Sequence, residues 1–111
     1  MVTIMKTMNK HQQIEIDLHI EAEYNGSEME LMSEVKHIMI DYPFRIDHNG
    51  SQNVYDIKPT SSLRELIAET QKVFVREYEA GNCDAPHELS DFWFEHITVH
   101  KNNCANIYFG S

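Results

Sequence analysis

Apolar and polar residues alternate without a break from Gln13 to Tyr24. The apolar positions are Ile14, Ile16, Leu18, Ile20, Ala22 and Tyr24, and the polar positions between them are Glu15, Asp17, His19, Glu21 and Glu23. A period of two residues is typical of a β-strand that buries one face and exposes the other. The pattern therefore predicts a half-buried strand over this segment.

The Asn25-Gly26 pair predicts a tight turn after this strand, because both residues tolerate the positive φ angles of a type I′ hairpin. The hairpin sets Ile20 opposite Leu31, so that the apolar residues of both strands share one face. A helix over residues 27–40 is the competing interpretation, since its first residues imitate a capping box. We favour the hairpin because its register explains more residues.

The same register places acidic residues opposite one another on the polar face. The opposed pairs are Glu23 with Glu28, Glu21 with Glu30, Asp17 with Glu34, and Glu15 with Lys36. Only the last pair is complementary, and like charges that face each other destabilise a sheet, here by about 1 kcal/mol in total. Two interpretations stay open: a solvated face that charge keeps soluble, and a docking face for a basic protein surface.

A second hairpin is expected further along the chain. Residues 35–47 continue as extended chain and are interrupted by Pro43, which belongs at an edge or a bend. The Asn-Gly pair at residues 49 and 50 predicts a turn, and the return strand contains Val54, Tyr55 and Ile57.

A long amphipathic helix is predicted to start at Ser62, because Glu65 stands three residues later as in a capping box. Apolar residues and one threonine then recur at three- and four-residue steps. They are Leu63, Leu66, Ile67, Thr70, Val73, Phe74 and Tyr78. Gly81-Asn82 supplies the stop signal, and the stripe is expected to face the core.

The pattern over residues 91–101 predicts a strand in which the apolar residues change sides midway: Phe92 and Phe94 lie at even positions, and Ile97 and Val99 lie at odd positions. A bulge near Glu95 or His96 reconciles the two halves. After a turn, the last strand directs Ala105, Ile107 and Phe109 inward. The bulge puts Trp93 on the outer side with His96, Thr98 and His100, where an exposed Trp93 would anchor an interface, although a buried tryptophan is the more common case.

These elements predict an α+β fold: a mostly antiparallel sheet of three β-hairpins, two before and one after the helix, packed against that helix. The 111 residues are 41% hydrophobic and 24% charged, which fits one domain over residues 1–111. Residues 1–11 are expected to be disordered or a short extension. They lack the continuous apolar core of a secretory signal, so a cytoplasmic location is expected, with Cys83 and Cys104 as free thiols.

The formal net charge of -9 argues against nucleic acid and anionic membranes as partners, since both repel an acidic chain. It favours a protein partner with a basic surface. The oligomeric state does not follow from the sequence.

Candidate chemistry is sparse. The one ligand-like cluster is Cys83, His87, His96, His100 and Cys104. Its spacing matches no compact zinc module, so neither a metal nor another cofactor is expected. His87-Glu88 lacks the second histidine of a zinc-protease helix, and no phosphate loop or nucleophile elbow occurs. A grouping of His96, His100 and Lys101 could cleave phosphodiesters, but the acidic chain would repel that substrate. We therefore expect no enzyme.

The leading hypothesis is a small acidic inhibitor that covers the basic active site of another protein, as an immunity protein or antitoxin neutralises a toxin such as a nuclease. This rests on analogy between classes of protein. The expected partner-binding residues are Glu15, Asp17, Glu21, Glu23, Glu28, Glu30, Glu34 and Trp93. The alternative is a structural or adaptor domain of phage or mobile-element origin, followed by a small metal-binding domain or enzyme.

Overall fold

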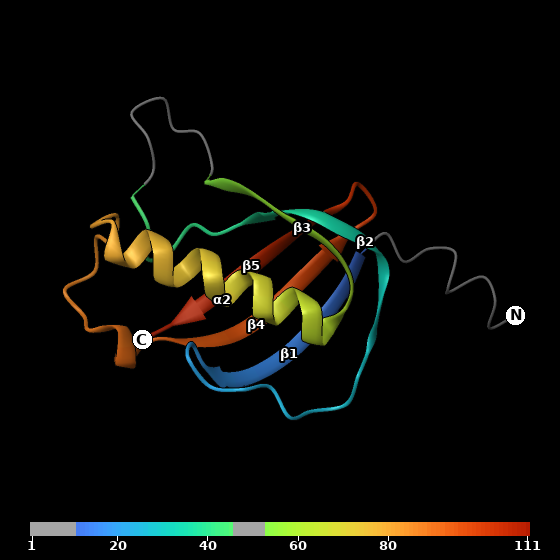
Figure 1. Ribbon diagram of the computed structural model, residues 1–111, viewed down its shortest axis with the longest axis horizontal. Coiled ribbons are helices and arrows are strands. Elements are labelled where there is room, and N and C mark those ends of the chain that lie inside the picture. Colours follow the sequence, from blue (N-terminus) through green and yellow to red (C-terminus); the bar gives the residue numbers. More distant parts are fainter. Residues whose placement is uncertain (1–10, 46–52) are drawn as a thin grey trace, which may run out of the picture.

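The computed structural model describes residues 11–45 and 53–111, in which five strands form one sheet and one long helix packs on it (Figure 1). The elements are β1 (His11–His19), β2 (Glu30–Met39), β3 (Val54–Ser62), α2 (Leu63–Glu79), a 3-10 turn η1 (Leu89–Asp91), β4 (Trp93–His100) and β5 (Cys104–Gly110). The extension expected at residues 1–11 lies outside the described residues except for His11, which begins β1.

The strand order is β1-β4-β5-β2-β3, so the fold is α+β with a mixed sheet. Three of the four strand pairings are antiparallel, and the central pairing of β2 with β5 is parallel. The described sheet contains two hairpin pairs, β2 with β3 and β4 with β5, where three were expected. The second Asn-Gly pair lies between β2 and β3, outside the described residues.

The predicted pairing of the first strand with the second is wrong. β1 pairs antiparallel with β4, while β2 is bonded to β3 on one side and to β5 on the other. This arrangement avoids the charge repulsion of the predicted hairpin, because Glu15 lies opposite His96 and His11 lies opposite His100. None of the three predicted acid–acid pairs is a cross-strand pair in the described sheet.

The segment around Asn25-Gly26 is an irregular connection, and neither residue has a positive φ angle. The Arg64 side chain on α2 holds it instead. The guanidinium donates hydrogen bonds to the carbonyls of Tyr24, at 2.7 Å, and Gly26, at 3.2 Å. The Tyr24 hydroxyl also donates to the Ser27 carbonyl over 2.9 Å. These tertiary contacts replace the local turn that the pair predicted.

The strand expected over residues 35–47 ends early, at Met39. The chain then turns through a cis peptide bond between Tyr42 and Pro43. Phe44 follows with an isolated bridge to Cys83 and a buried ring. Pro43 was expected at a sheet edge or at a bend, and it lies at a bend.

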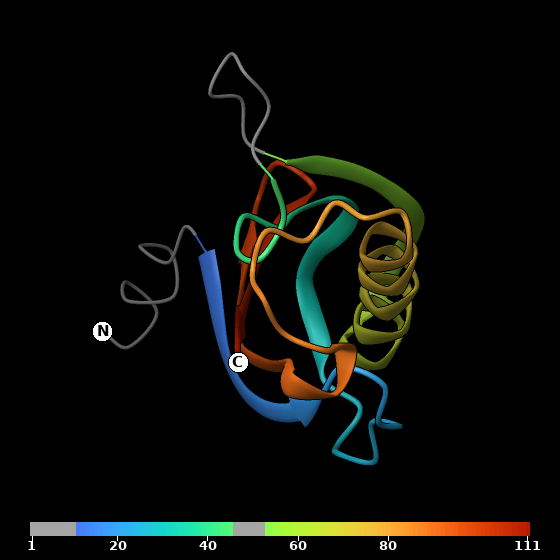
Figure 2. The same ribbon diagram turned by 90° about the vertical axis from the view of Figure 1, so that its left-hand side faces the viewer.

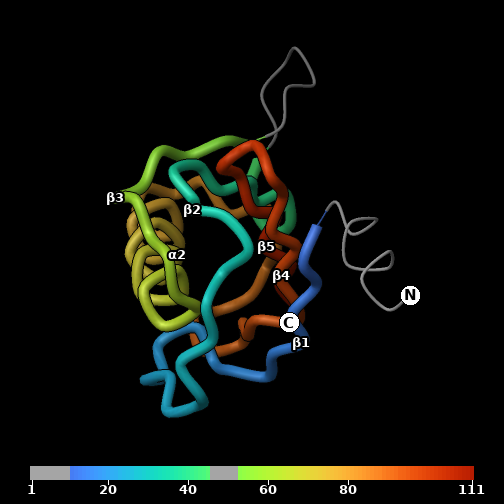
Figure 3. The backbone as a smooth tube through the Cα atoms, turned by 90° about the vertical axis from the view of Figure 1, so that its right-hand side faces the viewer, coloured from blue at the N-terminus to red at the C-terminus, as the bar shows by residue number. Residues whose placement is uncertain are grey.

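One side-chain amide and one hydroxyl hold the curled part of the sheet together, where β2 and β3 bend toward α2 (Figures 2 and 3). Gln12 on β1 accepts from the Met32 backbone N–H over 2.9 Å and donates to the Glu30 carbonyl over 3.3 Å. The Ser33 hydroxyl donates to the His100 carbonyl on β4 over 2.8 Å. These bonds tie the first half of β2 to strands that are not its ladder neighbours.

The helix is confirmed at both ends. The Ser62 hydroxyl accepts from the Glu65 backbone N–H, and the Glu65 carboxylate accepts from the Ser61 N–H over 3.2 Å. Gly81, with φ at 85°, terminates the helix just beyond its last residue. Six residues of the predicted stripe are buried and Tyr78 is half-buried.

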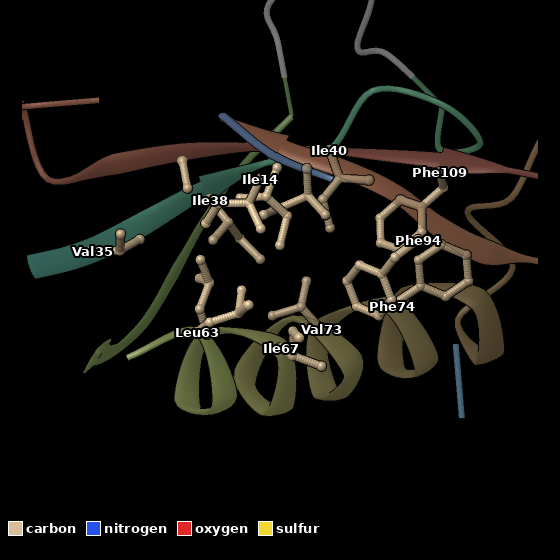
Figure 4. Close-up of a cluster of buried hydrophobic side chains, with 14 of the residues drawn as sticks. Ile14, Val35, Ile38, Ile40, Leu63, Ile67, Val73, Phe74, Phe94 and Phe109 are labelled. Carbon is tan, nitrogen blue, oxygen red and sulfur yellow. The ribbon is translucent and has the colours of Figure 1, made fainter. Parts of the chain in front are cut away.

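The core lies between this stripe and the inward face of the sheet, as Figure 4 shows for side chains that meet from both layers. Phe74 is at its centre, with its ring centroid 4.6 Å from that of Phe109 and 4.8 Å from that of Phe44. The bulge predicted in β4 is confirmed by a register shift between Phe94 and His96. It lets apolar residues of both parities reach this core.

We expect Thr70→Val to raise the free energy of unfolding by about 1 kcal/mol. Thr70 on α2 is fully buried, and its hydroxyl has no hydrogen-bond partner among the described residues. Valine keeps the shape and removes the desolvated polar group. Thr70→Ser, which keeps the hydroxyl and loses the methyl group, should lower stability. Denaturant unfolding measures both, and a destabilised Thr70→Val protein would contradict the prediction.

We expect Glu65→Gln to destabilise the protein at pH 7 and to have no effect at strongly acidic pH. The hydrogen bond from the Ser61 N–H, first among several causes, holds the pKa of the Glu65 carboxyl below its ordinary value. A lowered folded-state pKa contributes stability above the unfolded-state pKa of about 4, and this contribution disappears as pH falls through the folded-state value. Unfolding curves at pH 7 and pH 2 test this. Glu79→Gln, at the opposite helix end, is the control and should not be destabilising.

Candidate functional site

The helix covers one face of the sheet, and no other described element covers the opposite face of β1, β4 and β5 (Figure 2). The side chains on this open face, by register, are His11, Gln13, Glu15, Trp93, His96, Thr98, His100, Asn106 and Tyr108. The three strands contain no lysine or arginine. Trp93 lies here with His96, Thr98 and His100 as predicted, and 36% of its surface is exposed.

Aromatic and acidic groups gather at one end of the open face. The rings of His96 and Tyr108 stack, with centroids 4.2 Å apart and an interplanar angle of 19°. Trp93 and Glu95 both pack over Gly110, where an added Cβ would lie 2.9 Å from indole Cζ2 and 2.7 Å from Glu95 Oε2. The absence of a side chain at residue 110 therefore allows both groups to lie against β5.

A cavity of about 110 Å³ opens beside these residues, between β4, β5 and the end of β2. Its polar lining comprises Asp41, Tyr42, Glu95, His96, Asn106 and Tyr108, and we call it the Tyr108 slot. The Asn106 amide donates to the Tyr108 hydroxyl over 3.4 Å. The carboxylates of Asp41 and Glu95 form no hydrogen bond or ion pair with another residue in the described part of the chain. The slot thus presents two carboxylates that no described residue neutralises, beside aromatic rings.

The structure brings three of the predicted partner-binding acids together. Glu15, Asp17 and Glu23 line a groove of about 430 Å³ beside the N-terminal end of α2, which we call the acidic groove. Its apolar lining is Ile16, Leu18, Tyr24 and Leu63. Arg64, which follows Leu63 on α2, donates to backbone carbonyls and forms no ion pair with these carboxylates.

The other predicted acids are scattered although all are exposed. Glu21 lies in a separate groove that Lys72, Arg76 and Glu79 also line. Glu28 lies in the connection before β2, and Glu30 begins that strand. Glu34 on β2 is 3.8 Å from the Lys36 ammonium. Trp93 lies on the open face and not in the acidic groove, so the eight predicted residues do not form one surface.

The cysteines and histidines of the ligand-like cluster do not converge. No group of three or more His, Cys, Asp or Glu side chains among residues 11–45 and 53–111 is arranged to hold a metal ion. Cys83 and Cys104 are free thiols, and burial raises the pKa of Cys104. Burial also raises the pKa of Tyr55 to about 12, chiefly because the phenolate would be desolvated.

No protein-family model, curated protein sequence or solved structure matches this chain. Within the described ranges, no helix combines the length and the apolar character that crossing a membrane requires. The geometry of the two surfaces therefore carries the functional argument.

The sequence reasoning missed the Tyr108 slot, although part of its signal was present. Because Ile107 and Phe109 alternate inward, Tyr108 must point to the outer side that Trp93 and His96 share. The contribution of Asp41 was not accessible in this way, because it depends on the unpredicted parallel pairing of β2 with β5.

We expect Gly110→Ala to displace Trp93 toward solvent and to lower the free energy of unfolding by about 1–2 kcal/mol, as overpacking does. The added Cβ lies within 3 Å of both the indole and the Glu95 carboxylate, and the rigid indole must move. Trp93 is the single tryptophan, so its fluorescence emission should shift to longer wavelength. An unchanged emission maximum would show that the indole does not rest on Gly110.

Proposed function

We propose that this protein is a non-catalytic inhibitor that binds a basic partner protein, as immunity proteins and antitoxins cover the active site of a toxin such as a nuclease. The acidic groove carries the proposal. Three exposed carboxylates surround an apolar floor, and no lysine or arginine lies among the described residues that line it. A charged rim around an apolar centre is the usual anatomy of a protein–protein interface.

Electrostatics favours a basic partner over other occupants of the groove. Glu15, Asp17 and Glu23 repel one another weakly in solvent, and a cationic surface would relieve that repulsion on binding. The net charge of -9 adds a long-range field that accelerates the approach of a basic protein and repels phosphate. Association should accordingly be fast and should weaken as salt concentration rises.

The apolar floor supplies the contact that charge alone does not. Ile16, Leu18 and Tyr24 are half-buried beside the buried Leu63, so a partner side chain inserted there would complete their burial. The bonds from Arg64 to the carbonyls of Tyr24 and Gly26 hold the far wall of the groove in place. A groove with a fixed wall loses less conformational entropy when it binds.

We expect the double charge reversal Asp17→Lys with Glu23→Lys to weaken binding of the basic partner at least tenfold, about 1.4 kcal/mol. The partner is first captured from the source organism with tagged protein and identified. Its affinity is then measured by titration calorimetry, and its catalytic activity is measured with and without the inhibitor. Thermal unfolding should change little, because both residues are exposed.

The matched control is Asp56→Lys with Glu79→Lys, which changes the net charge equally at exposed positions outside the groove. It should retain most of the affinity. Equal losses of affinity in the two variants would show that the net charge, and not the groove, determines binding. An unaffected partner activity, or a partner without a basic surface, would contradict inhibition and favour the adaptor hypothesis.

A further inference from the structure

We propose that the Tyr108 slot binds one arginine side chain of a basic partner protein. The inference rests on the proposed function for the source of that arginine and adds a second contact on the open sheet face. The slot is distinct from the acidic groove, because the two cavities share no lining residue.

The charge of the slot selects a cation. Asp41 and Glu95 line it, and neither carboxylate bonds to another residue within the described part of the chain. The strands β1, β4 and β5 around it contain no lysine or arginine that could neutralise them. A guanidinium has five N–H donors, enough to serve both carboxylates and the Tyr108 hydroxyl.

The aromatic lining selects a planar cation. Tyr108 is held by its stack against His96 and is 40% exposed, and Tyr42 is 46% exposed. The Tyr42 hydroxyl is fixed by a hydrogen bond of 2.6 Å with Ser111. Guanidinium groups stack on aromatic faces and are more weakly hydrated than ammonium groups, so arginine fits better than lysine.

The size of the slot limits its occupant to a side chain. Its volume of about 110 Å³ is well below the roughly 300 Å³ at which small-molecule pockets begin. The exposed Trp93 indole stands beside Glu95 over Gly110, so a polypeptide that delivered the arginine would also meet an apolar anchor.

Another protein is the expected source of the arginine. This chain has arginines at residues 45, 64 and 76 only, and each side chain is already bonded within the molecule. Arg45 donates to Asp84, Arg64 to the carbonyls of Tyr24 and Gly26, and Arg76 to Glu77. A second copy of the chain would have to break one of these bonds to offer an arginine, and its net charge of -9 opposes its approach.

The test uses Trp93 fluorescence as a local reporter, since no other tryptophan is present. Full-length protein is titrated with N-acetyl-arginine amide at constant ionic strength. A saturable change is expected, together with no change for the neutral citrulline analogue and at least fivefold weaker binding of the lysine analogue. The absence of saturation, equal binding of citrulline, or equal binding of lysine would each overturn the proposal.

The decisive variant is Asp41→Asn with Glu95→Gln, which should weaken N-acetyl-arginine amide binding at least tenfold. The matched control, Asp17→Asn with Glu23→Gln, neutralises one aspartate and one glutamate of the acidic groove and should leave that binding unchanged. All four residues are exposed, so thermal unfolding of both variants should follow that of the native protein. Unchanged binding in the slot variant would overturn the proposal.

The two proposals fail separately. In one outcome, the slot binds N-acetyl-arginine amide, but reversal of the groove charges does not change the affinity for the captured partner. The proposed function then fails, and the slot remains an arginine site. If the partner depends on the groove while the slot variant binds it with native affinity, the slot fails as a partner contact and the proposed function stands.

Discussion

The parallel contact between β2 and β5 is the constraint on which the rest of this fold depends. It is short, joining His37–Met39 to Cys104–Asn106, and it is the only ladder in the described sheet that links the β2–β3 hairpin to β4 and β5. Asn103, in a turn with a φ angle of 65°, reinforces this contact. Its carbonyl accepts hydrogen bonds from the backbone N–H groups of Lys36 and His37. Its side-chain amide donates to the Glu34 carbonyl over 2.8 Å. Because β2 is thereby bonded on both edges, β1 pairs elsewhere.

Among residues 11–45 and 53–111, this order of strands leaves one long helix, α2, to cover the sheet. A helix of 17 residues is about 26 Å long and covers one face only. The strands β4 and β5 divide their side chains accordingly, with Ile97, Ile107 and Phe109 buried beneath α2 and histidine, asparagine and tyrosine on the other side. The open face is thus a consequence of the topology. Its side chains are mostly aromatic and polar, and its three strands contain no lysine or arginine.

Local signals predicted elements well and predicted their pairing poorly. Ser62 and Glu65 define the helix start through bonds between near neighbours, and the parity change around Glu95 reveals the bulge, so both are readable from the sequence. The Asn25-Gly26 signal failed because Arg64, 38 residues or more away in the chain, holds that segment in another conformation. The opposed acids of the predicted hairpin were themselves a physical argument against it, since β4 offers β1 histidines in place of carboxylates. The grouping of Glu15, Asp17 and Glu23 in one groove follows from their nearness in sequence, whereas the slot requires strands whose neighbours were not predicted.

The two anionic cavities suit different stages of one binding event. The carboxylates of the acidic groove are exposed on β1 and in the connection that follows it, where charge acts mainly on the rate of encounter and is screened by salt. The carboxylates of the Tyr108 slot line it together with the stacked rings of His96 and Tyr108, and Glu95 also stands beside the Trp93 indole. A cation bound there loses part of its water and meets a rigid surface. Interactions of that kind act mainly on the lifetime of a complex. A division between steering by the groove and retention by the slot also explains why Trp93 stands beside Glu95 at the slot and does not line the acidic groove.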